Sequence, residues 1–236
     1  MANAHGKTVA IFLGDTNVSG FLNANDITVN SELADTTNYS DEDRTHLAGL
    51  ITGSATLGGH YDGAANAIDE ELTNSLKTST LLSVAYGAAL SDRWVGMQIQ
   101  ASDYTISPPV GDVSVISYTA QADDAGVSRG TVLHPIANVE TGNGEETHID
   151  QGQASANGCN AFLHVTAFTG TDIDILIEDA AADNGFATLV TFAQVTGITS
   201  ERVKIAAAAT TPNRWIKVSW TGTFSSCTFI VGMERI

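Results

Sequence analysis

The segment Thr171–Glu178 constrains the fold of this chain most strongly. In it Ile173, Ile175 and Ile177 alternate with mainly acidic residues, and this period of two predicts a strand with one buried and one solvated face. Two Gly-containing dipeptides, Asn184-Gly185 and Thr221-Gly222, predict turns between strands. Together with five similar segments, this pattern predicts six strands in an antiparallel β-sandwich. The other five segments are Ala161–Phe168, Phe186–Val195, Glu201–Ala206, Arg214–Trp220 and Cys227–Glu234.

The N-terminal part of the sequence also favours strands, with one helix. Apolar residues spaced three and four apart between Asp62 and Lys77, namely Ala65, Ile68, Leu72 and Leu76, predict a helix with Asp62 as its N-cap. We therefore expect a mainly β protein in which one helix covers a sheet. The predicted strands are Thr8–Leu13, Ile27–Asn30, Gly53–Leu57, Leu81–Tyr86, Arg93–Ala101, Val113–Gln121 and Gly130–Val139.

The segment Ser31–Ala48 differs from its surroundings. It is rich in acidic residues and shows no periodicity of a buried strand. We expect it to form a long acidic loop between two strands. Such a polar insertion in a compact domain is more often functional than idle.

The charge of the chain excludes two classes of partner. Its 236 residues include 27 acidic and 10 basic side chains, a formal charge of −17. Residues 1–140 hold 17 acids and 5 bases (−12), and residues 141–236 hold 10 acids and 5 bases (−5). A protein that binds nucleic acids or anionic membranes through their phosphates needs clustered Lys and Arg. We therefore expect neither to be bound, and the lack of a long apolar run or signal peptide predicts synthesis in the cytosol.

Composition also suggests a division of the chain. Residues 141–158 are polar and rich in Gly, as in a linker. We therefore expect a domain over 1–140, a linker over 141–158 and a C-terminal β-sandwich over 159–236.

The sequence contains no recognisable catalytic, cofactor-binding or metal-binding motif. Asp172 and Asp174 could offer oxygens to calcium, but alternation alone already predicts a solvated polar face there. A carboxylate-dependent hydrolase is an enzyme alternative without a convergent site to support it. Cys159 and Cys227 could form one disulfide, although a reducing compartment disfavours it. We expect no enzyme activity, no cofactor and no metal.

Tryptophans provide a possible ligand site. Trp220 is in phase with Ile216 and Val218 and is expected in the core, whereas Trp215 falls on the opposite face with Lys217. An exposed indole can stack on a sugar ring. This leaves open an alternative function as a capsid decoration protein or adhesin that binds glycan through Trp215.

The order of motifs in the first 140 residues resembles the major tail tube proteins of long, non-contractile-tailed bacteriophages. The motifs are Asp35-Thr36-Thr37, then Tyr39 and Asp41, and Tyr61-Asp62 at the start of the helix. Leu47, Gly49, Leu50 and the segment Gly53–Gly59 complete the pattern. The C-terminal part resembles the extra sandwich appended to some of these proteins. The segments on which this second resemblance rests are His164–Thr166, Thr171–Asp179, Asp183-Asn184-Gly185-Phe186, Thr191–Thr196, Ser200-Glu201-Arg202, Arg214–Ser219 and Thr228–Arg235.

The resemblance implies a structural role in the virion tail, after assembly in the host cytoplasm. Such proteins form hexameric rings that stack into a tube and contact other phage tail proteins, and the DNA passes through the lumen without specific binding. The appended sandwich decorates the outside. The loop after the early strands contacts the next ring. In this chain the corresponding residues are Glu32, Asp35, Thr36, Thr37, Tyr39, Asp41, Glu42, Asp43 and Arg44.

Overall fold

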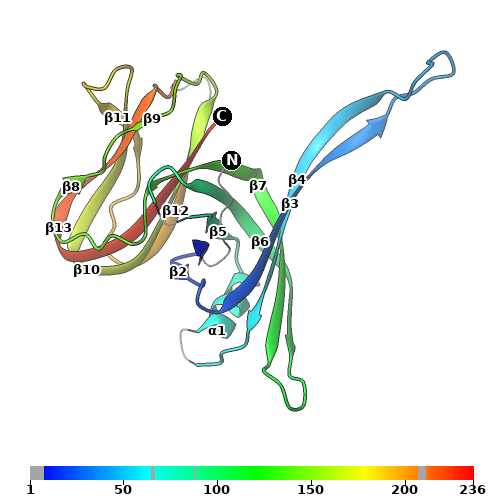
Figure 1. The fold of residues 1–236 in the computed structure, drawn as a ribbon, viewed down its shortest axis with the longest axis horizontal. Coiled ribbons are helices and arrows are strands. Elements are labelled where there is room, and N and C mark those ends of the chain that lie inside the picture. Colours follow the sequence, from blue (N-terminus) through cyan, green and yellow to red (C-terminus); the bar gives the residue numbers. More distant parts are fainter. Residues whose placement is uncertain (1–7, 65–66, 88, 207–210) are drawn as a thin grey trace. The chain divides into compact units, whose positions relative to one another are not determined.

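A computed structural model describes residues 8–64, 67–87, 89–206 and 211–236 (Figure 1). Strands dominate it, and one helix, α1 (Ile68–Ser75), occurs in the described residues. This confirms the mainly β fold. No helix in the described part is long and apolar enough to cross a membrane. The strands are β1 (Ala10–Leu13), β2 (Thr16–Asn17), β3 (Leu22–Asp35), β4 (His46–His60), β5 (Thr80–Ala85), β6 (Arg93–Ser107), β7 (Val115–His134), β8 (Gly144–Glu145), β9 (Ile149–Asp150), β10 (Gly158–Ala180), β11 (Ala187–Thr191), β12 (Thr199–Ala206) and β13 (Trp215–Arg235).

The chain forms two compact units that are each discontinuous in sequence. Unit 1 comprises Met1–Gly20, Leu81–Gly96 and Ser128–Ile236, and unit 2 comprises Phe21–Thr80 and Met97–Val127. These boundaries divide the chain differently from the expected ranges 1–140 and 159–236, because the long strands β6 and β7 each contribute residues to both units.

Unit 2 is built on the central strand β4. This strand pairs with β3 along nearly its whole length, from Leu22↔Gly59 to Asp35↔His46, and its C-terminal part also pairs with β7 on the other side, from Ser54↔Gln121 to His60↔Val115. Leu57 of β4 and Tyr118 of β7 are completely buried. The Tyr118 hydroxyl lies 2.9 Å from the Ser75 hydroxyl at the end of α1. The helix thus joins the core of this unit through both packing and a hydrogen bond.

The helix is shorter than the sequence predicts. It begins after Ala67, whose side chain makes no capping hydrogen bond. Asp62 is not the N-cap; its carboxylate instead accepts a hydrogen bond from the Ala64 amide at 2.9 Å. Ile68 and Leu72 are fully buried as expected, whereas Leu76 is 36% exposed, and Ala65 lies outside the described residues.

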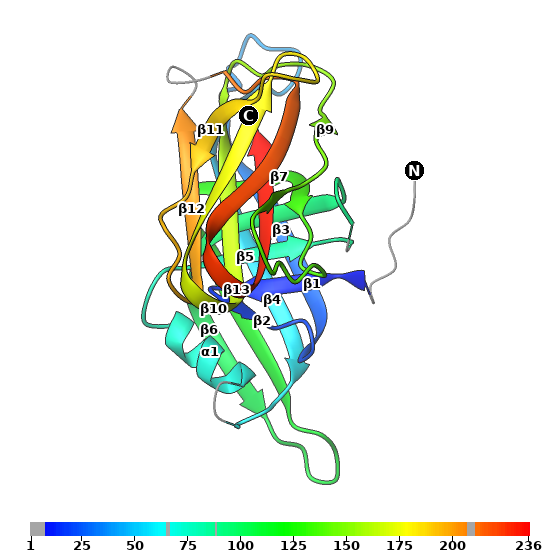
Figure 2. The ribbon, with the colours of Figure 1, turned by 90° about the vertical axis from the view of Figure 1, so that its left-hand side faces the viewer.

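Unit 1 contains the longest strand pair in the described part of the chain. β10 and β13 are antiparallel from Cys159↔Arg235 to Ala180↔Trp215 and run side by side in Figure 2. The prediction of two shorter strands at each of these places was wrong. Register shifts between Val165 and Ala167 and around Gly170 interrupt the alternation without ending β10, and this mimics a loop in the sequence.

One of the two predicted turns was also wrong. Thr221-Gly222 lies inside β13, where its residues pair with Asp174 and Ile173 of β10. A Cβ at Gly222 would lie 2.4 Å from the backbone oxygen of Asp172, so this glycine permits close strand approach rather than a turn. Asn184-Gly185 does lie in the connection between β10 and β11, with φ +68° at Gly185.

The predicted alternation in β10 is confirmed. Ile173, Ile175 and Ile177 are fully buried, and Asp172 and Asp174 on the other face are partly exposed. The isoleucines join a core with residues of β11 and β13. Cys159 and Cys227 are both buried and free.

The segment 141–158, expected as a linker, runs along β13 within unit 1. Its two short strands pair with β13 at Trp220↔Gly144 and Ile216↔Ile149. Ile149 is buried. A composition poor in apolar residues therefore coexists here with regular backbone pairing.

The prediction of two strands over Val113–Gln121 and Gly130–Val139 was wrong as well, because β7 is one strand that ends at His134 before Pro135. Positive φ angles at Asp124 (48°) and Gly126 (68°) mark an irregularity in the strand. The polar residues around this irregularity separate two apolar stretches, and the sequence pattern therefore resembles two strands and a loop.

Candidate assembly surface

The outer part of the β3–β4 hairpin, residues 29–53, is called the arm below (Figure 1). Its strands pair from Val29↔Gly53 to Asp35↔His46, and only residues 36–45 connect them. The long loop expected over Ser31–Ala48 is thus shorter than predicted, because its two ends, Ser31–Asp35 and His46–Ala48, belong to the strands. Because nearly all of these side chains are exposed, neither face imposes the alternation of a buried strand, and the sequence does not reveal it.

One face of the arm is apolar. Ala55 and Leu57 of β4 lie on the face that is buried in unit 2, and Ile51 continues this face outward with 66% of its surface exposed. On the paired strand β3, the side chain of Val29 is 36% exposed and that of Leu33 is 62% exposed. Both positions are an even number of residues from Ser31, which pairs with Ile51, so they lie on the same face. The core-facing side of the sheet therefore extends beyond the core.

The opposite face of the same hairpin is largely polar. Thr28 pairs with Ser54, and Asn30 pairs with Thr52. The register shift between Ser31 and Leu33 interrupts this pattern near the tip, where exposed Leu47 pairs with Ala34. The base of the arm is thus an amphipathic hairpin: Val127 of β7 lies against its apolar face at Gly53, whereas Ile51 and Leu33 farther out on this face are exposed.

The tip of the arm is organised by its own hydrogen bonds. The carboxylate of Asp35 accepts a hydrogen bond from the Thr37 amide at 2.9 Å, and Asp41 accepts two from Asn38 at 2.9 Å. The bonds from Thr37 lower the pKa of Asp35. Tyr39 remains fully exposed between these turns. The tip therefore presents an aromatic ring on a self-supported acidic loop.

The structure brings the predicted inter-ring residues together on the arm. All are exposed except Asp41, which is partly buried. Sequence reasoning did not include the exposed apolar residues Leu33, Leu50 and Ile51 in this set. Their signal was the presence of large aliphatic side chains in a segment otherwise suited to solvent. The residues gathered here are Glu32, Asp35, Thr36, Thr37, Tyr39, Asp41, Glu42, Asp43 and Arg44.

Trp215, the candidate sugar-stacking residue, lies in unit 1 among partnered groups. It is partly exposed, whereas Trp220 is buried, as the alternation predicts. The Arg214 guanidinium lies 5.5 Å from the centre of the Trp215 ring. The ring of His148 lies nearly perpendicular to that of Trp215, with 5.5 Å between the two ring centroids. Arg214 also pairs with Asp150. The indole is thus covered in part by side chains of its own unit.

The described residues contain no group of three His, Cys, Asp or Glu side chains placed to hold a metal ion. Asp172, considered for calcium, accepts a hydrogen bond from the Thr223 amide at 2.9 Å. This bond between β10 and β13 gives the carboxylate a structural role.

No protein-family model and no curated protein matches this chain. It is similar to a chain from the virion of a native gene transfer agent (GTA) particle, with 17% identity and a TM-score of 0.46 over 54% of this chain and 98% of that chain. It is also similar to the SPP1 tail tube protein, with 9% identity and a TM-score of 0.46 over 55% of this chain and 80% of that chain. The Dit protein of SPP1, part of a hub adsorption apparatus, is 9% identical to this chain. Its TM-score is 0.37 over 97% of this chain and 99% of that chain.

Proposed function

We propose that this chain is a structural protein of a bacteriophage tail that assembles with copies of itself into hexameric rings, which stack into a tube. The observation that carries this proposal is the apolar face of the arm. Large exposed apolar surfaces on soluble proteins mark interaction sites, and this one continues the buried face of unit 2 through Ile51 and Leu33. A contact of this kind between different surfaces of identical chains generates rings or filaments.

The acidity of the chain supports a passive relation to DNA in such a tube. With a formal charge of −17, the protein repels phosphates, so a genome can move through a lumen without being held. The tip residues then contact the next ring, and the strands of 159–236 lie outside the lumen. Other tail proteins cap the tube, which is assembled in the host cytoplasm and has no catalytic role.

The experiment compares assembly by electron microscopy and sedimentation velocity. The wild-type chain is expected to form stacked sixfold rings. The double variant Leu33→Asp/Ile51→Asp should remain monomeric, since it places charges on the apolar face. The matched control Asn30→Asp/Thr52→Asp adds the same charges to paired residues of the polar face and should still assemble.

Three outcomes would overturn the proposal. A wild-type chain that stays monomeric at every concentration would exclude a self-assembling tube, and unchanged assembly of the Leu33/Ile51 variant would remove the role of the apolar face. Single rings that never stack would refute the tube and indicate a component present as one ring.

A further inference from the structure

Unit 2 carries a second exposed apolar surface, at the end of its sheet opposite the arm (Figure 1). It lies where β6 and β7 are joined, and residues 106–115 are called the β6–β7 loop below. The exposed fractions of its four aliphatic side chains range from 41% to 107%. These side chains are Ile106, Val110, Val113 and Val115. Apolar side chains gathered at one exposed place on a soluble protein indicate an interaction surface.

Strand β4 links this loop to the arm. It begins with His46, which pairs with Asp35 near the tip of the arm, and it ends with His60, which pairs with Val115 of the β6–β7 loop. Its 15 residues span ~45 Å at ~3.3 Å per residue. The two apolar surfaces therefore lie at opposite ends of one sheet, and a single chain cannot bring its own arm and its own loop together.

Both surfaces extend the same side of the sheet. The Tyr104 hydroxyl of β6 donates a hydrogen bond to Asp69 of α1 at 2.7 Å, which places Tyr104 on the side that the helix covers. Ile106 lies two residues farther along the strand and therefore on that side as well. The helix lies on the core-facing side, where its last residue bonds to Tyr118. The arm extends this side at the other end of the sheet through Ile51.

Charge excludes ion pairs as the link between the two surfaces. The arm, residues 29–53, contains five acidic residues and one arginine, and the β6–β7 loop contains one acidic residue and no basic one. Both surfaces are net negative, so they repel each other electrostatically. A contact between them has to be made by the apolar side chains, which leave water together. Salt should strengthen such a contact, because it screens the repulsion.

We propose that the β6–β7 loop of one copy of the chain receives the apolar face of the arm of a second copy. This contact rests on the proposed function and names the surface that the arm meets there. Leu33 and Ile51 of one chain then lie against Ile106 and Val113 of the next. Because the two surfaces differ and lie at opposite ends of the sheet, each contact leaves a free arm at one end and a free loop at the other. The contact can therefore repeat along the direction of β4, as growth of a tube requires.

Cross-linking between introduced cysteines tests the contact in the full chain. In Ile51→Cys/Val113→Cys, a short bis-maleimide should join each arm to the loop of a neighbour, and a ladder of products longer than a dimer should appear on a denaturing gel. Either substitution alone permits dimers at most. The native Cys159 and Cys227 are buried, and free thiols are blocked before denaturation. The control Thr52→Cys/Val113→Cys moves the arm thiol to the polar face and should give no ladder.

A pair of charge variants tests the same contact without cross-linking. Ile106→Asp/Val113→Asp should lose assembly as Leu33→Asp/Ile51→Asp does, because it breaks the contact from the other side. Its thermal stability should be unchanged, since both replaced side chains are exposed. The control Thr105→Asp/Ser107→Asp adds the same charges to the exposed polar neighbours of Ile106 and should still assemble. Raising the ionic strength should lengthen wild-type tubes.

The outcomes separate this contact from the proposed function. A wild-type chain that stays monomeric would overturn both. Wild-type tubes without a ladder in Ile51→Cys/Val113→Cys, or undiminished assembly of Ile106→Asp/Val113→Asp, would overturn the contact alone. Dimers as the main product of Ile51→Cys would show that arms pair with each other, and this would refute the contact too. Tubes that shorten in high salt would refute an apolar contact between like-charged surfaces.

Discussion

His164 and Ser83 share a buried hydrogen bond in unit 1, with 2.7 Å between Nε2 and the hydroxyl oxygen. The other ring nitrogen, Nδ1, lies 2.5 Å from the carbonyl oxygen of Gly14. A carbonyl only accepts, so Nδ1 carries the proton and Nε2 accepts from the Ser83 hydroxyl. The imidazole is therefore neutral and fully paired, and burial lowers its pKa to about 4.

This histidine should make the stability of the protein depend on pH. Its pKa falls from 6.5 in the unfolded chain to about 4 in the folded protein, so acid favours the unfolded state. The contribution of the neutral His164 to the free energy of unfolding is fully present above pH 6.5 and is lost as the pH falls toward 4. At pH 5 the loss should reach ~2 kcal/mol, measurable by urea unfolding at pH 7.5 and 5.

The variant His164→Gln isolates this effect. It should be less stable than the wild type at pH 7.5 by ~1–3 kcal/mol, since buried polar partners lose their bonds, yet its stability should change less between pH 7.5 and 5. His148→Gln provides the control, because that side chain is 41% exposed. An unchanged pH response in His164→Gln would contradict the prediction.

Gly130 on β7 should be intolerant of a side chain. A Cβ there would lie 1.8 Å from the backbone oxygen of Met233 on the paired strand β13, and backbone atoms cannot rotate away. Gly130→Ala should lower the free energy of unfolding by more than ~2 kcal/mol. The control Gly142→Ala meets nothing within 4 Å and should have little effect; equal thermal stability of the two variants would refute the reasoning.

The two thiols should be unreactive in the native protein. Burial raises the pKa of both Cys159 and Cys227 to about 11, and only the thiolate is nucleophilic. Labelling with a maleimide at pH 7.5 should be slow in buffer and rapid in denaturant, and a reductant should leave the unfolding midpoint unchanged. Rapid labelling of either cysteine in the native state would contradict this.

Removing the tip of the arm tests the predicted inter-ring contact. Replacement of residues 36–45 by Asn-Gly keeps the pairing of Asp35 with His46 and supplies a two-residue hairpin turn. The shortened chain should fold with unchanged thermal stability and form rings that no longer stack. Tubes of normal length in electron micrographs would refute the contact.

The sequence revealed secondary structure best where one face is buried. Ile173, Ile175 and Ile177 were identified correctly because alternate residues of β10 lie in different surroundings. It failed for the outer parts of β3 and β4, where both faces are exposed, and at Thr221-Gly222, where a glycine serves close strand approach. Alternation reports burial rather than backbone conformation.

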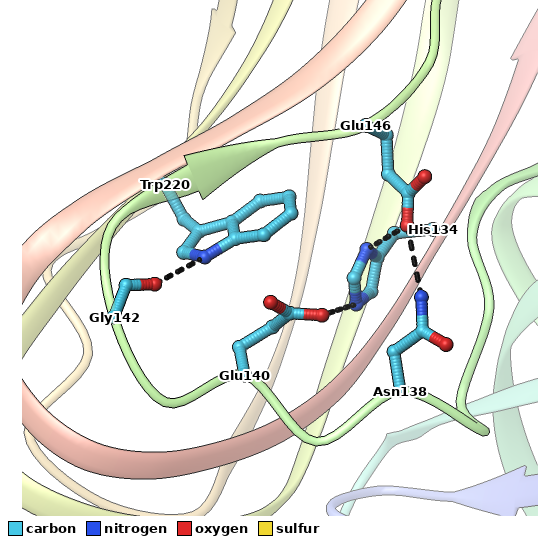
Figure 3. Close-up of polar contacts among 6 residues, drawn as sticks. All are labelled: His134, Asn138, Glu140, Gly142, Glu146 and Trp220. Carbon is cyan, nitrogen blue, oxygen red and sulfur yellow. Dashed lines mark hydrogen bonds and ion pairs between the residues drawn. The ribbon is translucent and has the colours of Figure 1, made fainter.

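The site was predicted only in part for a similar reason. The polar tip residues were proposed from a resemblance to a motif and stay a prediction, whereas the exposed Leu33 and Ile51 were not included. Apolar residues in a sequence suggest a core, and only the structure shows that these two lie outside it. The approach of Glu140 and Glu146 to the buried His134 (Figure 3) also depends on how residues 135–150 cross β13, which no local pattern encodes.

The discontinuity of unit 1 sets an order for folding during translation. All segments of unit 2 lie before residue 128, whereas β10 of unit 1 must wait for β13, whose residues Trp215–Arg235 leave the ribosome much later. Unit 2 can therefore form while the partner of β10 does not yet exist. Until then the apolar face of β10, including Ile175, remains uncovered on the nascent chain, and this interval is when the protein most needs a chaperone.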